Sequence, residues 1–206
     1  MCCRYYILPD DPELYPMMET AAKSPLIRRF DPFQSAPFVR SGEVAPTNLA
    51  TVIATDRRLK PAVFPMRWGF TVPGRGTPVV NARAETAAEK PSFRDAWQKH
   101  RCIVPASWYF EWQHLPGEGG GKPVKVKYAI RPKDAGITWI CGLYRIESGL
   151  PVFVILTRAP SDDVAFIHDR MPLILPRDAV RDWINPAVRA EDLLPYAVTS
   201  LSAQPA

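Results

Sequence analysis

The chain has 206 residues, the length of one compact domain, and its 47% hydrophobic and 23% charged residues are close to globular averages. These values exclude a disordered, coiled-coil or collagen-like protein, and no apolar stretch approaches the roughly 20 residues of a membrane-spanning helix. The net charge of +5 permits an anionic partner such as nucleic acid without requiring one.

The first predicted elements are a helix over residues 15–22 and a β-branched strand over residues 49–55. A second helix is predicted over residues 93–99, with Ser92 as its N-cap and Asp95 as the capping-box partner. The 23 prolines are scattered between apolar runs, which indicates many short strands and turns.

The middle of the chain is dominated by strands separated by short turns. The predicted strands cover residues 101–104, 108–113, 124–130, 137–146 and 152–157, with a hairpin loop at 117–121 and a turn at 147–149. Because consecutive strands joined by short turns pair antiparallel, these segments predict a central antiparallel sheet.

Two further helical segments are predicted near the end of the chain. Ser161 is the expected cap of a short turn of helix over residues 162–167, and a helix over residues 177–184 follows Pro176. The sequence therefore predicts a single α+β domain over residues 1–206, built on a strongly bent, barrel-like, mainly antiparallel sheet with flanking helices.

Four cysteines are present, and two of them, Cys102 and Cys141, lie within strand patterns typical of small buried hydrophobic residues. The first residues lack the basic and apolar regions of a secretory signal, so a cytoplasmic protein without disulfides is expected. The cysteines and histidines do not have the spacing of a zinc site. We therefore expect neither a metal nor another cofactor.

Cys2 is distinguished by its position directly after the initiator methionine. Its side chain is small enough for that methionine to be removed, which leaves an α-amine and a thiol on one residue. Such a 1,2-aminothiol condenses with an aldehyde to a five-membered thiazolidine, or it acts as an N-terminal nucleophile in amide hydrolysis. The alternative is a cysteine without a function at a flexible chain end.

Three further residues are candidates for chemistry. Asn81 follows an apolar pair at a strand end, Glu111 lies in an aromatic run, and His168 ends a short predicted helix beside an acid and a base. A carboxylate among aromatic residues and a histidine both suit general acid–base work. The alternatives are a turn residue, a solvent-facing strand glutamate and a capping or core histidine; His100 and His114 are expected at the surface.

Together these residues resemble the SRAP family, the SOS response-associated peptidase or abasic-site processing proteins. The resemblance rests on Cys2, MRWGF at 66–70, NARAET through EKPSFRDAW at 81–97, RCIVPASWYFEW at 101–112 and HDRMPLIL at 168–175. These blocks run in family order from residue 2 to about 185, so they cover nearly the whole chain and leave a short C-terminal tail.

The resemblance implies a protein that binds single-stranded DNA and traps the aldehyde of an abasic site as a thiazolidine crosslink through the amine and thiol of Cys2. It implies that Asn81 positions the amine or the sugar, that Glu111 is the general acid–base, and that His168 assists sugar-ring opening. Some strand cleavage by β-elimination is an expected side activity.

The implied DNA contacts are phosphate contacts by Arg4, Arg83 and Arg170, and an apolar platform for bases made by Trp68 and Pro46. The expected protein is a monomer whose partner is single-stranded DNA with abasic sites; it lies in the cytoplasm, and on the nucleoid when bound to DNA.

Four positions and the short C-terminal tail depart from the family pattern and bear on DNA affinity and on substrate context. Cys3 replaces a usual glycine, Glu43 a common asparagine, and Ser107-Trp108 a frequent Asp-Gly. Two other functions remain open at this point: a thiol-dependent peptidase that uses Cys2, His168 and Glu111, and a single-strand binder without catalysis.

Overall fold

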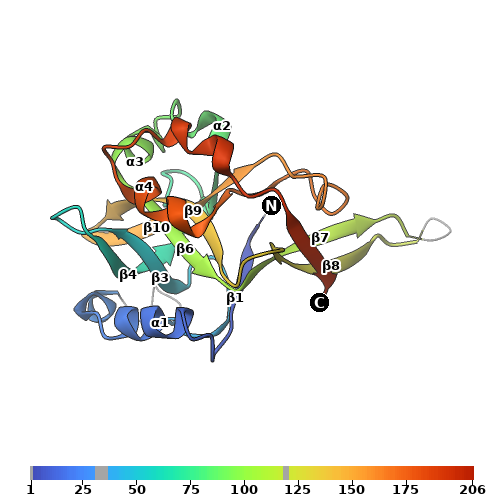
Figure 1. The fold of residues 1–206 in the computed structure, drawn as a ribbon, viewed down its shortest axis with the longest axis horizontal. Coiled ribbons are helices and arrows are strands. Elements are labelled where there is room, and N and C mark those ends of the chain that lie inside the picture. The colour runs from blue at the N-terminus through green and yellow to red at the C-terminus, as the bar shows by residue number, and fades with distance from the viewer. Residues whose placement is uncertain (1, 31–36, 118–120) are drawn as a thin grey trace.

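A computed structural model describes residues 2–30, 37–117 and 121–206 of the chain. Two β-sheets form its centre, and short helices lie around them (Figure 1). The predicted α+β fold with a bent, mainly antiparallel sheet is confirmed. Part of the predicted hairpin loop, residues 118–120, lies outside the described residues.

Five strands of the larger sheet pair in a closed ring. They are β3 (Leu49–Thr55), β4 (Pro61–Trp68), β6 (Arg101–Ala106), β9 (Thr138–Glu147) and β10 (Leu150–Arg158). The pairs β4–β3, β3–β6, β6–β9 and β9–β10 are antiparallel, and the parallel pair β10–β4 closes the barrel. Strands β3 and β10 are buried along almost their whole length, which explains their continuous apolar sequences.

Three short strands extend the barrel sheet. β5 (Asn81–Arg83) runs parallel to β10, β11 (Met171–Pro172) pairs with the end of β10, and β12 (Ile174–Leu175) pairs with β9. Residues from 81–83 and from 171–172 are thereby brought to neighbouring positions along one strand of the barrel.

The second sheet has five strands in the order β13-β8-β7-β1-β2. These are β13 (Leu201–Pro205), β8 (Val124–Pro132), β7 (Trp108–Leu115), β1 (Arg4–Ile7) and β2 (Gly42–Val44). The β7–β8 hairpin projects away from the barrel, and β13 lies across it (Figure 1).

Ser107 is the corner at which the chain passes from the barrel into the second sheet. Its backbone N–H donates to the carbonyl of Tyr6 at 2.8 Å, its Oγ accepts from the N–H of Leu8 at 2.9 Å, and its carbonyl accepts from Oγ1 of Thr138 at 3.2 Å. Through its backbone and its hydroxyl, this buried serine therefore joins the β1 segment of the second sheet to β9 of the barrel.

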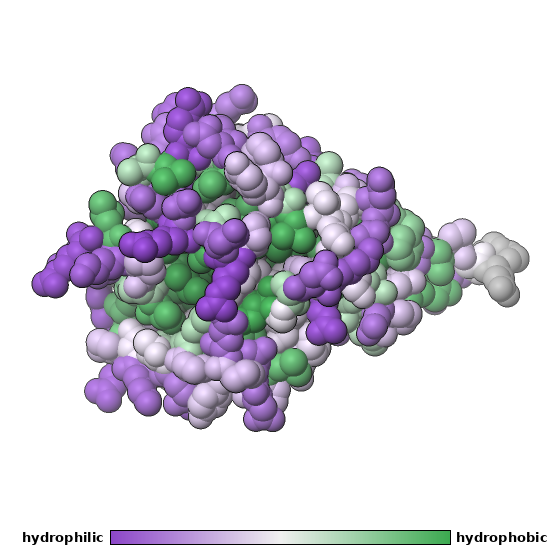
Figure 2. Space-filling model, viewed as in Figure 1, coloured by the Kyte–Doolittle hydropathy of each residue, from purple (hydrophilic) through white to green (hydrophobic). Residues whose placement is uncertain are grey.

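The helices are short and lie on opposite sides of the barrel (Figure 1). α1 (Leu14–Ala22) and η1 (Pro25–Arg29) lie on one side, while α2 (Ala84–Ala87), α3 (Arg94–Lys99) and α4 (Val180–Ile184) lie on the other. Single-turn elements η3 (Arg177–Ala179), η4 (Ala190–Asp192) and η5 (Leu194–Tyr196) surround α4. In the view of Figure 1, Figure 2 shows hydrophobic residues in the middle of the molecule, with hydrophilic residues around and between them.

A buried cation joins the helical cap to the barrel. Arg101, at the start of β6, donates four hydrogen bonds to backbone carbonyls: from Nε to Trp183 at 2.6 Å, from Nη1 to Trp97 at 2.9 Å, and from Nη2 to Asn185 at 2.6 Å and Val188 at 2.7 Å. Burial lowers the pKa of this guanidinium. The group satisfies the carbonyls at the ends of two helices, where no intrahelical partner exists.

Two capping predictions are wrong. α3 begins at Arg94 with Phe93 as its N-cap and without a side-chain cap. The N–H groups of Phe93 and Arg94 already donate to the carbonyl of Lys90, at 2.9 and 2.8 Å. Residues 162–167 form consecutive turns, and the hydroxyl of Ser161 makes no hydrogen bond within the described part of the chain. So short a segment offers too few hydrogen bonds to offset helix nucleation.

Candidate active site and DNA-binding surface

Cys2 is fully buried immediately before β1. Its thiol donates to the carbonyl oxygen of Arg4 at 3.6 Å, and its own carbonyl accepts a hydrogen bond from Nδ2 of Asn81 at 2.8 Å. The interpretation of Cys2 as a residue at a flexible chain end is therefore wrong.

Asn81 is the first residue of β5 and faces Ile155 across the parallel pair with β10. While its amide nitrogen is bonded to Cys2, its Oδ1 atom is buried and makes no hydrogen bond among the described residues. The Asn81 side chain thus joins the barrel to the N-terminal segment. Its Oδ1 atom can still accept a hydrogen bond from a bound molecule.

Glu111 lies in β7 and is buried, so the interpretation as a solvent-facing glutamate is wrong. Its Oε1 accepts from the backbone N–H of Trp112 at 3.2 Å. The carboxylate is near enough to Cys2 and to Tyr109 for its charge to affect both. A buried acidic group therefore lies beside the thiol.

Burial and charge keep the Cys2 thiol protonated at neutral pH. Burial raises its pKa well above the ordinary value, and the charge of Glu111 raises it further. Burial likewise raises the pKa of Tyr5 and of Tyr109, and the nearby Cys2 adds to both shifts. The surroundings of Cys2 thus disfavour negative charge on sulfur.

His168 follows the turns at 162–167, and its side chain is 27% exposed. Its Nδ1 atom lies 2.7 Å from Oδ1 of Asp169 and 3.0 Å from the backbone nitrogen of Arg170, so two neighbours orient the ring. The tautomer decides which contact is a hydrogen bond: an unprotonated Nδ1 accepts from the N–H of Arg170, and a protonated Nδ1 donates to Asp169.

A hydrogen bond joins the segment before His168 to β7, the strand that contains Glu111. Nε2 of Gln113 donates to the carbonyl of Phe166 at 3.1 Å, and the hydroxyl of Tyr128 donates to Oε1 of Gln113 at 3.3 Å. Gln113 is two residues beyond Glu111 and shares its face of β7. Sequence reasoning missed Gln113, although its spacing from Glu111 was a usable signal.

The three arginines expected to contact phosphates differ in their surroundings. Arg170 is 14% exposed; it forms two 2.8 Å hydrogen bonds to the Glu85 carboxylate and one of 2.7 Å to the carbonyl of Thr157. This partner holds the pKa of Glu85 below its usual value. Arg83 is exposed at the junction of β5 and α2, and Arg4 is the first residue of β1, two residues after Cys2.

The expected platform for bases needs correction at Trp68. This side chain is fully buried, its ring packs between Tyr5 and Phe153, and Nε1 donates to the carbonyl of Val80 at 2.9 Å. The ring belongs to the core and has no exposed face for a base. Pro46 is half-buried in a turn beside it.

Two of the three histidines were expected at the surface. His114 is exposed as predicted but lies in β7 rather than in a loop. His100 caps α3 and is half-buried against the ring of Tyr144, with centroids 5.0 Å apart. Cys102 and Cys141 are buried and free, as expected for small hydrophobic residues.

Alkaline pH is expected to destabilise the protein through its buried thiols. Burial raises the pKa of Cys2, Cys102 and Cys141 in the folded state, whereas an unfolded cysteine titrates near pH 8.5. The unfolded state therefore loses these protons first, so the stabilising contribution is complete below about pH 8.5 and is lost as the pH rises toward the folded pKa values.

At pH 10.5 the loss is on the order of 2 to 3 kcal/mol each for Cys2 and Cys102, since one pH unit corresponds to about 1.4 kcal/mol. Urea unfolding between about pH 7.5 and 10.5 measures this as a falling midpoint. The Cys102→Ala variant should show a shallower decline, and a midpoint that is independent of pH would contradict the assignment.

Comparison with known proteins agrees with these observations. The family model for SOS response associated peptidase (SRAP) matches residues 1–205. Abasic site processing protein YoaM of Bacillus subtilis is 33% identical over 196 residues, covering 86% of this chain and 84% of the relative. Abasic site processing protein YedK of Escherichia coli is 31% identical over 170 residues, covering 81% and 73%.

A solved structure has the same fold. The crystal structure of a phage-related protein from Bordetella bronchiseptica superposes with a TM-score of 0.72 at 25% identity, covering 100% of this chain and 94% of the other. In the described parts of this chain, no helix is long and apolar enough to cross a membrane.

Proposed function

The chain belongs to the SRAP family, and on that basis we propose that it captures abasic sites in single-stranded DNA by a covalent bond to Cys2. The observation that carries the proposal is the burial of Cys2 between two groups able to assist the chemistry, the amide of Asn81 and the carboxylate of Glu111. The proposed protein acts as a monomer in the cytoplasm and joins the nucleoid when bound to DNA.

The proposed reaction begins with removal of Met1, which frees the α-amine of Cys2. An abasic sugar is a cyclic hemiacetal, and His168 moves the proton that opens it to the aldehyde. The amine attacks the aldehyde carbon to form a carbinolamine, and Glu111 protonates the leaving hydroxyl as water departs. A protonated imine (iminium) remains between the amine nitrogen and the sugar carbon, and Glu111 is left as a carboxylate.

The thiol completes the ring in the second stage. Glu111, now a carboxylate, accepts the S–H proton as sulfur bonds to the iminium carbon, and the electron pair of the C=N bond returns to nitrogen, which keeps the proton it already carries. The product is a thiazolidine, and the whole process releases one water. Because burial keeps the thiol protonated, the amine reacts first and sulfur attacks only after a base has taken its proton.

Glu111→Gln is expected to slow crosslink formation by about 10²–10⁴-fold, because the amide neither donates nor accepts the proton that both stages require. The measurement is the single-turnover rate of adduct formation at saturating DNA. DNA affinity should stay near wild type, since Glu111 is buried. A Glu111→Gln variant that reacts at the wild-type rate would exclude the acid–base role.

The direct test uses a single-stranded oligonucleotide with one abasic site. A denaturation-resistant adduct should form, with the summed mass of protein and DNA less one water. An oligonucleotide whose abasic site has been reduced to the alcohol is the matched control, because it has the same shape without an aldehyde. Failure to form the adduct would refute the proposal.

The same preparation distinguishes the other two functions. Release of peptide fragments without DNA would favour a thiol-dependent peptidase, and salt-sensitive binding without an adduct would favour a non-catalytic single-strand binder. Shortened DNA fragments alongside the adduct would reveal the expected β-elimination side activity.

A further inference from the structure

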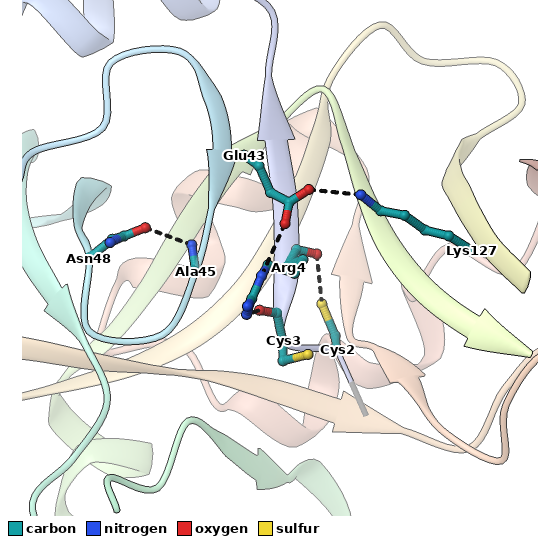
Figure 3. A network of polar contacts seen from close by, with 7 residues as sticks. All are labelled: Cys2, Cys3, Arg4, Glu43, Ala45, Asn48 and Lys127. Carbon is teal, nitrogen blue, oxygen red and sulfur yellow. Dashed lines mark hydrogen bonds and ion pairs between the residues drawn. The ribbon is translucent and has the colours of Figure 1, made fainter. Parts of the chain in front are cut away.

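An acidic side chain occupies the space between two cations beside the N-terminal segment (Figure 3). Oε1 of Glu43 lies 3.0 Å from Nε of Arg4, and Oε2 lies 2.8 Å from Nζ of Lys127. The side chains of Glu43, Arg4 and Lys127 are 40%, 35% and 29% exposed, so all three reach solvent. Arg4 and Lys127 together form an anion site, which Glu43 fills in the free protein.

This anion site is directly connected to Cys2. Nη1 of Arg4 donates to the carbonyl of Cys3 at 2.8 Å, and the Cys2 thiol contacts the carbonyl of Arg4 itself. Lys127 faces Trp112 across the β7–β8 pair, one residue beyond Glu111. A strand with its sugar at Cys2 therefore has this pair of cations within reach of a neighbouring phosphate.

The cations also lie on an aromatic surface suited to a single strand. Nζ of Lys127 is 3.7 Å from the ring centroid of Phe110 and 5.7 Å from that of Trp112. On the same face of the sheet, the rings of Tyr6 and Trp108 stack with centroids 4.6 Å apart. Cations interleaved with aromatic rings are the usual composition of single-strand binding surfaces.

We propose that Glu43 is an internal competitor of DNA phosphate, and that binding of a strand displaces its carboxylate from Arg4 and Lys127. The proposal rests on the proposed function. β2 is an edge strand of three residues, so the backbone of Glu43 stays paired with Tyr6 while its side chain turns toward solvent. Because exposed ion pairs are weak, a DNA phosphate can displace the Glu43 carboxylate at little cost in free energy. The carboxylate therefore affects the affinity for DNA and not the rate of the crosslinking reaction.

The test is the Glu43→Gln variant with a single-stranded oligonucleotide that has no abasic site. Its affinity should rise about three- to tenfold at low salt, because one or two cations become available for phosphates. The slope of log K against log salt should become steeper by about 0.7 for each phosphate gained. The crosslinking rate at saturating abasic DNA should remain that of wild type.

Glu19→Gln is the matched control. Glu19 also lies between two cations, Arg40 at 3.2 Å and Lys23 at 3.9 Å, but it belongs to α1 on the side of the barrel away from α2, α3 and α4 (Figure 1). Both variants change the net charge equally. If Glu43→Gln binds the strand no more tightly than wild type or than Glu19→Gln, the inference is overturned. Because this oligonucleotide has no aldehyde, the affinity measurement does not depend on whether the crosslinking reaction occurs.

Discussion

Cys2→Ala is expected to abolish the denaturation-resistant adduct, with a loss of at least about 10³-fold in yield at a fixed time. Alanine retains the α-amine after removal of Met1 and still forms an imine, but without sulfur the imine cannot close to a thiazolidine and hydrolyses. The measurement is the fraction of abasic oligonucleotide retained in a denaturing gel. DNA affinity should be close to wild type, because Cys2 is fully buried.

Two further variants separate the amine from the thiol. Cys2→Ser should form an imine adduct with the abasic site. Borohydride should reduce this adduct to a stable product, and without borohydride heating should remove it. Cys3→Ala is the control for the neighbouring thiol, which is only half-buried, and it should crosslink normally. If Cys2→Ala crosslinks and Cys3→Ala does not, the nucleophile has been assigned to the wrong residue.

Arg101→Met is expected to lower the free energy of unfolding by about 3–5 kcal/mol. The guanidinium donates to four backbone carbonyls in and after α3 and α4, and methionine removes all four of these hydrogen bonds. Among the described residues, the carbonyl of Asn185 would keep only its bond from the N–H of Val188. For a protein of this size the loss corresponds to a fall in melting temperature on the order of 10 °C. Thermal unfolding followed by circular dichroism measures it.

Arg101→Lys should be intermediate, because an ammonium group has three donors on one atom and cannot reproduce the planar arrangement of the guanidinium. Arg181→Met, at an exposed position of α4, is the matched control and should stay within about 0.5 kcal/mol of wild type. Equal stability of Arg101→Met and Arg181→Met would show that the buried cation contributes nothing to the fold.

The sequence predicted the helices and strands whose residue pattern is repeated over several neighbouring positions. The strands at β3, β6, β7, β8, β9 and β10 and the helix at α1 appeared near their observed positions, because alternation and apolar spacing are properties of neighbouring residues. The strand pairs that close the barrel could not be predicted from local patterns, because β10 pairs with β4 and β5, which are far away in sequence. The short strands β1 and β5 are likewise defined by partners that are distant in sequence, β7 for β1 and β10 for β5.

The candidate site divides in the same way. Cys2, Asn81, Glu111 and His168 were predicted from residue type and position, because their chemistry is a property of the side chain, and their catalytic roles stay predictions. Trp68 was misplaced, since a tryptophan in a strand gives no local sign of whether its ring is covered. Lys127 was overlooked because its importance depends on a contact with Glu43 across 84 positions of the chain.

Burial of Cys2 also has a protective consequence. Oxidants and alkylating agents attack exposed thiolates, and Cys2, Cys102 and Cys141 offer them neither exposure nor a ready negative charge. Cys3 is the more accessible thiol of the adjacent pair, so it takes the first damage. In the folded protein an oxidant in solution therefore reaches the thiol of Cys3 more readily than the thiol of Cys2.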